Sequence, residues 1–193
     1  MTKEHIGIIL AGGQSRRFGC PKVFAGYKNQ PFYQHAIQTL TPFSIDIYMI
    51  IQNKWRDDLK NSSVSLLEDT PKFAGDGPLA GIYSAMEVTN ATWYMVIPID
   101  TPLIRPVIFE KLMEKRDEKR QAVIPFVDGR KQPLIAIYHH DTKPIIKEQL
   151  QKGDRSMKGL LDRISVQYVP FSDSDKHVFI NINSKEDYQK LPM

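Results

Sequence analysis

Four short apolar runs, each followed by a loop and a segment of helical periodicity, fill the first hundred residues of the chain. Uninterrupted apolar runs of this length are typical of strands that are buried on both faces. Strands that alternate with helices predict a three-layer, Rossmann-like α/β fold, in which helices cover both faces of a mostly parallel sheet. Right-handed crossovers then place every strand-to-helix loop at one edge of that sheet. The runs are residues 6–10, 45–51, 64–67 and 93–97.

In the second half of the chain, strands and helices no longer alternate regularly. Further strands are expected at 122–126, 134–138, 166–169 and 178–182, and helices at 144–150, at 157–161 and from Ser184 onward. Asp128-Gly129 is a turn signal between the first two of these strands, and Asp187 stands at the third position of the last helix. Neither an internal repeat nor a low-complexity linker is visible, so residues 1–193 are expected to form a single domain.

Composition limits the cellular setting and the partners. No apolar run reaches the roughly 18 residues that a membrane span needs, and a single cysteine, Cys20, excludes an internal disulfide. The net charge is +4, but bases and acids are interspersed, as they are along an expected solvated helix at 110–120. We therefore expect a cytoplasmic protein with neither a membrane nor a nucleic acid as partner, whose mild positive charge suits small polyanionic substrates.

The loop after the first strand, residues 11–22, is a candidate phosphate-binding segment. Its glycines allow the backbone to approach a ligand closely, and its amides and cations can bind phosphate oxygens. The spacing matches neither a Walker A loop nor a dinucleotide-binding motif, so a glycine-rich turn with incidental surface cations is the alternative. The residues concerned are Gly12, Gly13, Gly19, Arg16, Arg17 and Lys22.

Two carboxylates follow expected strands at the same edge of the sheet. Asp100 follows the fourth strand and Asp69 the third. Mg²⁺ prefers oxygen ligands, commonly one or two carboxylates with phosphate oxygens and water. Asp100 is therefore the candidate metal ligand, and the alternative is a solvated Asp that begins an Asp-Thr-Pro turn. The alternative to a ligand contact for Asp69 is a cap of the turn before Pro71. Gly77 could lie against a purine base or simply supply a positive φ.

The segment 10–22, LAGGQSRRFGCPK, resembles the signature loop of nucleotidyltransferases with a glycosyltransferase-A-like, nucleotide-diphospho-sugar-transferase-like fold. Residues 77–82 (GPLAGI), 97–103 (IPIDTPL) and 181–187 (NINSKED) resemble segments of one branch, the molybdenum cofactor guanylyltransferases. Residues 132–134 and 153–156 fit more weakly. Pro21 departs from the pattern, because the residue before the lysine is often acidic in this family.

This resemblance implies the substrates GTP and molybdenum-loaded molybdopterin, and Mg²⁺ as cofactor. GMP would pass to the terminal phosphate of the pterin, pyrophosphate would leave, and other molybdenum cofactor biosynthesis proteins would be partners. Residues 1–105 would bind nucleotide and metal, and residues 106–193 the acceptor. A transferase that uses CTP or a sugar phosphate, and a non-catalytic nucleotide-binding regulator, are the alternatives.

The resemblance also implies roles for individual residues. The family's asparagine after the second strand maps to Asn53, or to Gln52 if one gap is placed differently. The implied catalytic residues are Lys22, Asp100 and Arg17; the nucleotide-binding residues are Leu10, Ala11, Gly12, Gly13, Lys22, Asn53, Asp69, Gly77 and Asp100; the acceptor-binding residues are Arg155, Asn181 and Asn183; and the metal ligand is Asp100.

His139 and His140 stand together after an expected strand. Without a third ligand nearby, the pair favours a surface strand end over a zinc site.

Overall fold

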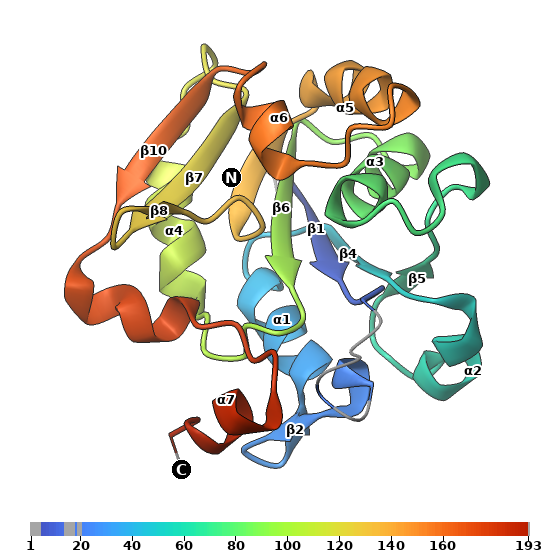
Figure 1. Ribbon diagram of the computed structural model, residues 1–193, viewed down its shortest axis with the longest axis vertical. Coiled ribbons are helices and arrows are strands. Elements are labelled where there is room, and N and C mark those ends of the chain that lie inside the picture. Colours follow the sequence, from blue (N-terminus) through green and yellow to red (C-terminus); the bar gives the residue numbers. More distant parts are fainter. Residues whose placement is uncertain (1–4, 14–17, 19–20, 193) are drawn as a thin grey trace.

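A central sheet of eight strands organises the chain, in the order β10-β7-β9-β6-β1-β4-β5 with β8 paired to β7 (Figure 1). The computed structural model describes residues 5–13, 18 and 21–192. The strands are β1 (His5–Leu10), β4 (Asp46–Ile50), β5 (Ser65–Leu67), β6 (Trp93–Pro98), β7 (Ala122–Val127), β8 (Arg130–Lys131), β9 (Ala136–His139) and β10 (Val166–Pro170). A separate hairpin consists of β2 (Gly26–Tyr27) and β3 (Gln30–Pro31).

Most neighbouring strands in the sheet are parallel. β5, β4, β1 and β6 form one parallel block, and β10 lies parallel to β7. β9 runs antiparallel to both β6 and β7 and so joins the two parallel parts. The expected mostly parallel α/β sheet is thereby confirmed, and its strand order brings the carboxyl-terminal ends of β4, β1 and β6 side by side.

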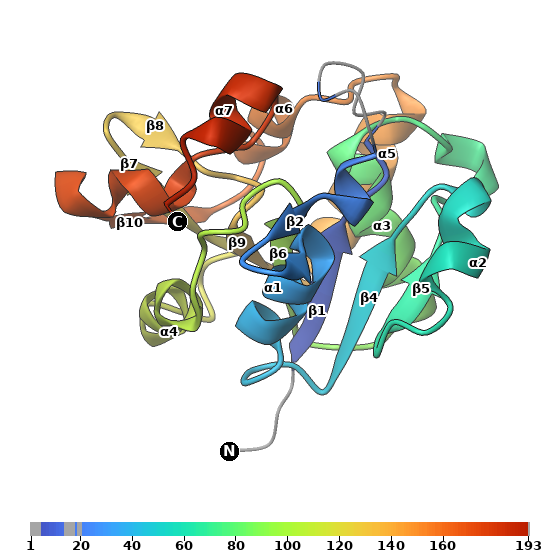
Figure 2. The ribbon, with the colours of Figure 1, turned by 90° about the horizontal axis from the view of Figure 1, so that it is seen from below.

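Helices cover both faces of the sheet, as Figures 1 and 2 show. α1 (Phe32–Leu40) and α4 (Pro106–Glu114) pack on one face, whereas α3 (Pro78–Val88), α5 (Thr142–Gln151) and α6 (Met157–Leu161) pack on the other. Side chains of β6 alternate between these layers, with Met95 in the first core and Val96 in the second. Two short helices, α2 (Arg56–Leu59) and α7 (Lys185–Gln189), complete the set. Among the described residues, no helix has both the length and the hydropathy to cross a bilayer.

The expected strand at residues 178–182 is wrong. A 3₁₀ helix occupies Asp173–Phe179, and the chain continues without a strand partner to α7. Ser172 and Asp175 form a capping box at the start of this helix, each side chain bonding the other's backbone amide. Such local hydrogen bonds compete with strand pairing and start a helical turn, although the apolar spacing of residues 178–182 looks like that of a strand.

Two boundaries between residues 110 and 135 also differ from expectation. α4 ends at Glu114 rather than near residue 120, and the Asp117 carboxylate accepts the Lys119 amide hydrogen in a turn (2.9 Å). Asp128 and Gly129 both have positive φ, 49° and 72°, as a two-residue hairpin turn requires. This turn leads into β8, however, and β9 follows only later.

Candidate nucleotide-binding site

The carboxyl-terminal ends of β1, β4 and β6 border a cavity of about 510 Å³. Parallel strands bring their following loops to the same edge, which is where open α/β sheets bind ligands. Most of the residues predicted for the site meet here although they are far apart in the sequence. The predicted residues that line the cavity are Leu10, Ala11, Gly12, Gly13, Lys22, Asn53, Asp69, Gly77, Asp100 and Asn181.

Lys22 connects three segments of the chain at one end of the cavity. Its ammonium Nζ lies 3.0 Å from Asp100 Oδ2 and donates a hydrogen bond to Asn183 Oδ1 at 2.7 Å. Asp100 and Asn183 are 78 and 161 positions away in the sequence. The side chains of Lys22 and Asp100 are only 11% and 19% exposed, so their charges are screened less than those of a surface pair.

Asp100 keeps one carboxylate oxygen unused. Oδ1 is buried and has no hydrogen-bond partner among the described residues. A buried acceptor without a partner costs about 1–3 kcal/mol, and a carboxylate oxygen is the ligand that Mg²⁺ prefers. The residue therefore fits a metal ligand. Its backbone is also fixed, because the Asp100 carbonyl accepts the Ile182 amide hydrogen at 2.8 Å.

Gln52 holds the glycine-rich loop against the sheet. Its Nε2 donates to the Gly12 carbonyl at 2.6 Å and to the Gly13 carbonyl at 3.3 Å. Gly12 and Gly13 line the cavity, and a Cβ built on either would meet no atom of the described residues within 4 Å. Gln52 and Asn53, the two residues to which the family's asparagine could map, both line the cavity. Gln52 in addition holds the two glycines through hydrogen bonds. Arg17 lies outside the described residues.

Gly77 forms the amino-terminal boundary of α3 at the cavity. Its backbone has φ 78° and ψ −160°, a conformation open mainly to glycine, and no side chain caps the helix. One turn later, Gly81 allows the helix to lie close to the sheet, since an added Cβ would come within 2.9 Å of Leu10 Cδ2. The helix amino terminus, which favours anions, thus borders the space next to the glycine-rich loop.

Asp69 and Arg155 both have Asp76 as a neighbour. Burial raises the pKa of the Asp69 carboxyl, as does the nearby Asp76 charge, while the hydrogen bond from the Gly75 amide (3.1 Å) lowers it. Arg155 pairs with Asp76 at 2.6 Å. Of the residues predicted to bind the acceptor, Asn181 lines the cavity. Arg155 is not among the described residues that do so.

The carboxyl-terminal segment organises the far end of the loop. Tyr188 of α7 packs edge-on against Phe18, with ring centroids 5.8 Å apart, and its hydroxyl donates to the Gly26 carbonyl. Asp187 caps the same short helix and accepts the Asn183 amide hydrogen at 3.0 Å. Sequence reasoning missed Tyr188, because no local pattern indicates which residue a terminal aromatic side chain contacts.

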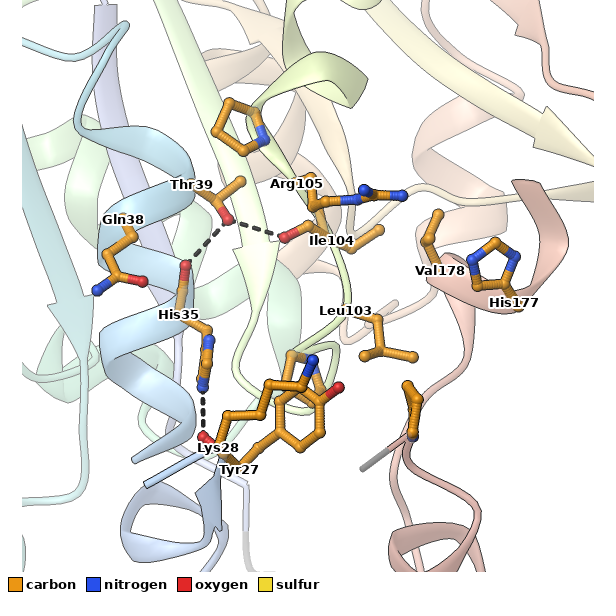
Figure 3. A pocket seen from close by; sticks show the side chains of 13 residues that line it. Tyr27, Lys28, His35, Gln38, Thr39, Leu103, Ile104, Arg105, His177 and Val178 are labelled. Carbon is orange, nitrogen blue, oxygen red and sulfur yellow. Dashed lines mark hydrogen bonds between the residues drawn. The ribbon is translucent and has the colours of Figure 1, made fainter. Parts of the chain in front are cut away.

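A second cavity of about 400 Å³ lies between the β2–β3 hairpin, α1 and residues 102–106 (Figure 3). Thr39 bonds the Ile104 carbonyl there at 2.9 Å, and His35 contacts the Tyr27 carbonyl at 2.8 Å. None of the predicted site residues that the structure describes lines this cavity. The cavity at the strand ends is therefore the candidate site.

The fold and this cavity define the class of protein: an α/β domain of the nucleotidyltransferase type. Residues 7–168 match the family described as MobA-like NTP transferase domain, and the chain belongs to this family. A Bacillus cereus protein named "Probable molybdenum cofactor guanylyltransferase" is 39% identical over 185 residues, which cover 94% of this chain and 92% of that protein. A Bacillus anthracis protein of the same name is 39% identical and covers 96% and 94% of the two chains.

Solved structures show the same fold. The molybdopterin-guanine dinucleotide biosynthesis protein A of Archaeoglobus fulgidus superposes with a TM-score of 0.80 at 24% identity, over 96% of this chain and 95% of that one. The 2-C-methyl-D-erythritol 4-phosphate cytidylyltransferase of Thermus thermophilus gives a TM-score of 0.71 at 12% identity, over 93% of each chain. At these identities the likeness concerns architecture alone.

Proposed function

We propose that this chain transfers GMP from GTP to the terminal phosphate of molybdenum-loaded molybdopterin. An oxygen of that phosphate attacks the α-phosphorus of GTP, the bond between the α-phosphorus and the bridging oxygen breaks, and pyrophosphate leaves. The product is the guanine dinucleotide form of the cofactor. The names of the relatives that are 39% identical suggest these substrates, and the joining of Lys22, Asp100 and Asn183 at one end of the cavity supports the chemistry.

The reaction needs no strong protein base. A phosphomonoester has a second pKa near 6, so the attacking phosphate is largely ionised at neutral pH. Accordingly, the described residues that line the cavity include neither histidine nor cysteine. Catalysis then rests on alignment of the two phosphates and on neutralisation of the charge on the leaving pyrophosphate.

Lys22 and Asp100 supply that charge control in our proposal. Asp100 would hold Mg²⁺ through the carboxylate that has a buried oxygen without a partner. When bound, the cation neutralises triphosphate charge and stabilises the leaving group. Lys22 contributes a second positive charge beside Asp100. Gly12, Gly13 and the amino terminus of α3 bind the nucleotide, and Gln52 positions the glycines through their carbonyls.

The acceptor is assigned to the side of the cavity that the second half of the chain forms. Residues 1–105 contribute the nucleotide and metal residues, and 106–193 the acceptor residues. Asn181 lines the cavity, and Asn183 accepts a hydrogen bond from Lys22, which supports this assignment of both residues. Arg155, which is not among the described residues that line the cavity, would reach an acceptor from the place where it pairs with Asp76.

Pyrophosphate release tests this function. GTP together with molybdenum-loaded, phosphate-terminated molybdopterin and Mg²⁺ should release pyrophosphate, and GTP alone should not. ATP, CTP and UTP serve as controls in the same assay. Release only with CTP, or only with a sugar phosphate as acceptor, would favour a sister transferase. Failure with every nucleotide would favour a non-catalytic regulator.

A further inference from the structure

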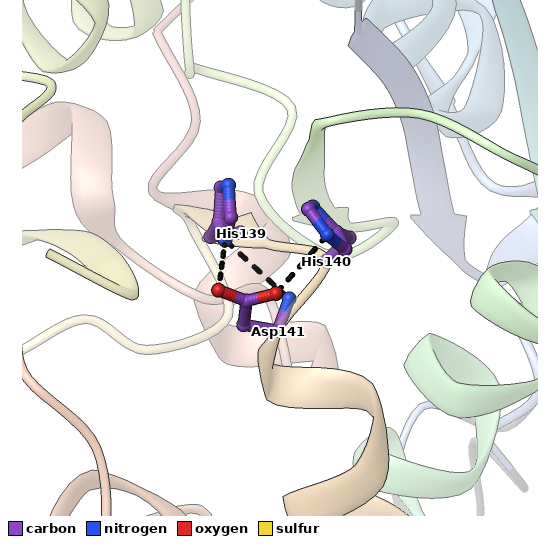
Figure 4. Close-up of side chains that lie close together, drawn as sticks. All are labelled: His139, His140 and Asp141. Carbon is purple, nitrogen blue, oxygen red and sulfur yellow. Dashed lines mark hydrogen bonds and ion pairs between the residues drawn. The ribbon is translucent and has the colours of Figure 1, made fainter. Parts of the chain in front are cut away.

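Three consecutive polar residues, His139, His140 and Asp141, form a compact cluster at the end of β9 (Figure 4). β9 runs antiparallel to β6, and His139 lies opposite Trp93, the first residue of β6. Asp100, in contrast, stands two residues after Pro98, the last residue of β6. The cluster therefore lies at the edge of the sheet opposite the nucleotide cavity, and the proposed transfer reaction does not use it.

The side chains of the cluster converge on one carboxylate. His139 Nδ1 lies 3.2 Å from Asp141 Oδ2, and His140 Nε2 lies 3.0 Å from Asp141 Oδ1. One ligand atom from each residue lies within 4.8 Å of the others. Around a tetrahedral zinc ion with bonds of about 2.0–2.2 Å, neighbouring ligand atoms are roughly 3.3 Å apart. The His139–Asp141 and His140–Asp141 separations are each within a few tenths of an ångström of that distance, and each involves a different oxygen of the Asp141 carboxylate. The sequence-based expectation that no third ligand is nearby is therefore wrong.

Hydrogen bonds fix the backbone that carries the cluster. The His139 amide donates to the Gln121 carbonyl at 2.9 Å, and the His140 amide donates to the Thr92 carbonyl at 3.0 Å. The Thr142 hydroxyl donates to the His139 carbonyl at 2.7 Å, where α5 begins. Ligands on a rigid backbone lose little conformational entropy when they bind an ion.

The two rings differ in exposure in a way that suits a binding site. The His139 side chain is 16% exposed and lies edge-on against the Trp93 ring, with centroids 4.9 Å apart. The side chains of His140 and Asp141 are 56% and 59% exposed. The inner ring is therefore held in place, while the outer side leaves room for an ion to enter and for water to complete its coordination.

We propose that His139, His140 and Asp141 bind one divalent transition-metal ion, preferably zinc. The ion would connect the end of β9 to the start of α5. Two imidazoles and one carboxylate are a ligand set for zinc and its neighbours, whereas Mg²⁺ prefers oxygen ligands alone. This site would consequently be distinct in both place and metal from the one proposed at Asp100. The competing interpretation is a carboxylate that only accepts hydrogen bonds from two histidine rings.

The test is a Zn²⁺ titration of the whole, chelator-treated chain in competition with a chromophoric chelator, in the presence of excess Mg²⁺. Asp141→Asn and His140→Gln are the test variants. Asp141 makes no side-chain capping bond to α5, and His140 is exposed, so both variants should fold. His177→Gln is the matched control, because His177 is an exposed histidine in the 3₁₀ helix Asp173–Phe179.

We expect wild type and His177→Gln to bind one Zn²⁺ with equal affinity, and both test variants to bind it about tenfold or more weakly. Zn²⁺ should also raise the Tm of wild type and not that of Asp141→Asn. Co²⁺ should give the visible absorption of a four-coordinate site. Equal Zn²⁺ binding by wild type and Asp141→Asn, or Zn²⁺ binding that Mg²⁺ displaces, would overturn the proposal. Pyrophosphate release bears on neither result, so the transfer function and this site can fail separately.

Discussion

Lys22 and Asp100 neutralise each other at the end of the cavity, and Asn183 accepts a further hydrogen bond from the lysine. Such a cluster keeps two charges in a weakly exposed place without leaving either unpaired. It also holds both groups within 3.0 Å of each other, next to the cavity lined by the glycine-rich loop. In our proposal, a phosphate group and its counter-ion bind at these two residues.

Asp100→Asn should reduce turnover far more than stability. The substitution keeps the shape and a hydrogen-bond acceptor for Lys22, but removes the negative charge that binds a hard cation. Loss of metal-assisted charge neutralisation is expected to lower the transfer rate by roughly a hundredfold or more, which is about 2.7 kcal/mol. The measurement is pyrophosphate release as a function of Mg²⁺ concentration, with circular dichroism on both proteins. A normal rate with an unchanged Mg²⁺ dependence would return Asp100 to the role of a turn former.

Lys22→Ala should reduce both turnover and stability. Loss of a charge-assisted phosphate contact worth about 1.5–3 kcal/mol corresponds to a rate loss of roughly ten- to a hundredfold. The Asp100 carboxylate also loses its counter-ion, so the free energy of unfolding should fall by about 1–3 kcal/mol. Denaturant titration and single-turnover transfer measure the two effects. Wild-type turnover in the variant would make Lys22 a structural ion-pair partner only.

The residues that meet at the strand ends could be predicted from the sequence, but their contacts could not. Asp69 and Asp100 follow apolar runs, and the geometry of a parallel sheet brings such positions together. The bond from Lys22 to Asn183 spans 161 positions and depends on how the last segment folds back, which no local pattern encodes. The pairing of Arg155 with Asp76 is hidden for the same reason.

At the scale of elements, α3 and the glycine-rich loop form two adjacent walls of the cavity. Gly81 places the helix against Leu10 of β1 and Ile50 of β4. Gly12 instead faces open space in the cavity. The two glycines therefore have different surroundings: Gly81 packs against the sheet, and we propose that Gly12 gives a ligand access to the backbone.

Gly81→Ala and Gly12→Ala should separate these two roles. An added methyl at Gly81 would lie 2.9 Å from Leu10 Cδ2 and 3.3 Å from Ile50 Cγ2, and overpacking of this kind costs about 1–3 kcal/mol of stability. Gly12→Ala should leave Tm unchanged and weaken nucleotide binding, because its methyl would project into unoccupied cavity space. The checks are thermal unfolding and nucleotide titration of both variants. A destabilised Gly12→Ala protein with normal nucleotide affinity would contradict this division.

Apolar periodicity predicted the elements better than it predicted their ends. The runs at 6–10 and 93–97 are strands because uninterrupted apolar side chains fill both faces of the sheet. The run at 178–182 has similar spacing, yet the capping box of Ser172 and Asp175 starts a 3₁₀ helix just before it. Local side-chain hydrogen bonds favour the 3₁₀ helix in this segment, and the pattern of apolar residues does not reveal such bonds.

At the scale of the whole molecule, the first and last parts of the chain meet around one cavity. Residues 10–13 at the end of β1 line the cavity, while residues 181–188 return to contact Lys22, Asp100 and Phe18. A nucleotide that binds there would link elements from both ends of the sequence. Binding should consequently stabilise the whole fold rather than one loop.

Thermal unfolding with four nucleotides measures that stabilisation. With Mg²⁺ and GTP at a hundredfold excess over Kd, the expected gain is about 2.7 kcal/mol, or a Tm increase of roughly 5–11 °C for a chain of this size. ATP and CTP should give clearly smaller increases, since guanine offers N1–H and N2–H₂ donors and an O6 acceptor that the other bases do not combine. Equal increases for all four nucleotides would remove the guanine preference and leave the family assignment intact.

The fate of the α-phosphorus tests the central proposal most directly. The chain is incubated with Mg²⁺, phosphate-terminated molybdenum-molybdopterin and GTP that carries an isotope label at its α-phosphoryl group. The products are then separated and identified by mass spectrometry. We predict that the label appears in a pterin guanine dinucleotide and that unlabelled pyrophosphate forms in equal amount. Label recovered only as free GMP, or a dinucleotide formed from CTP but not from GTP, would contradict the proposed guanylyl transfer.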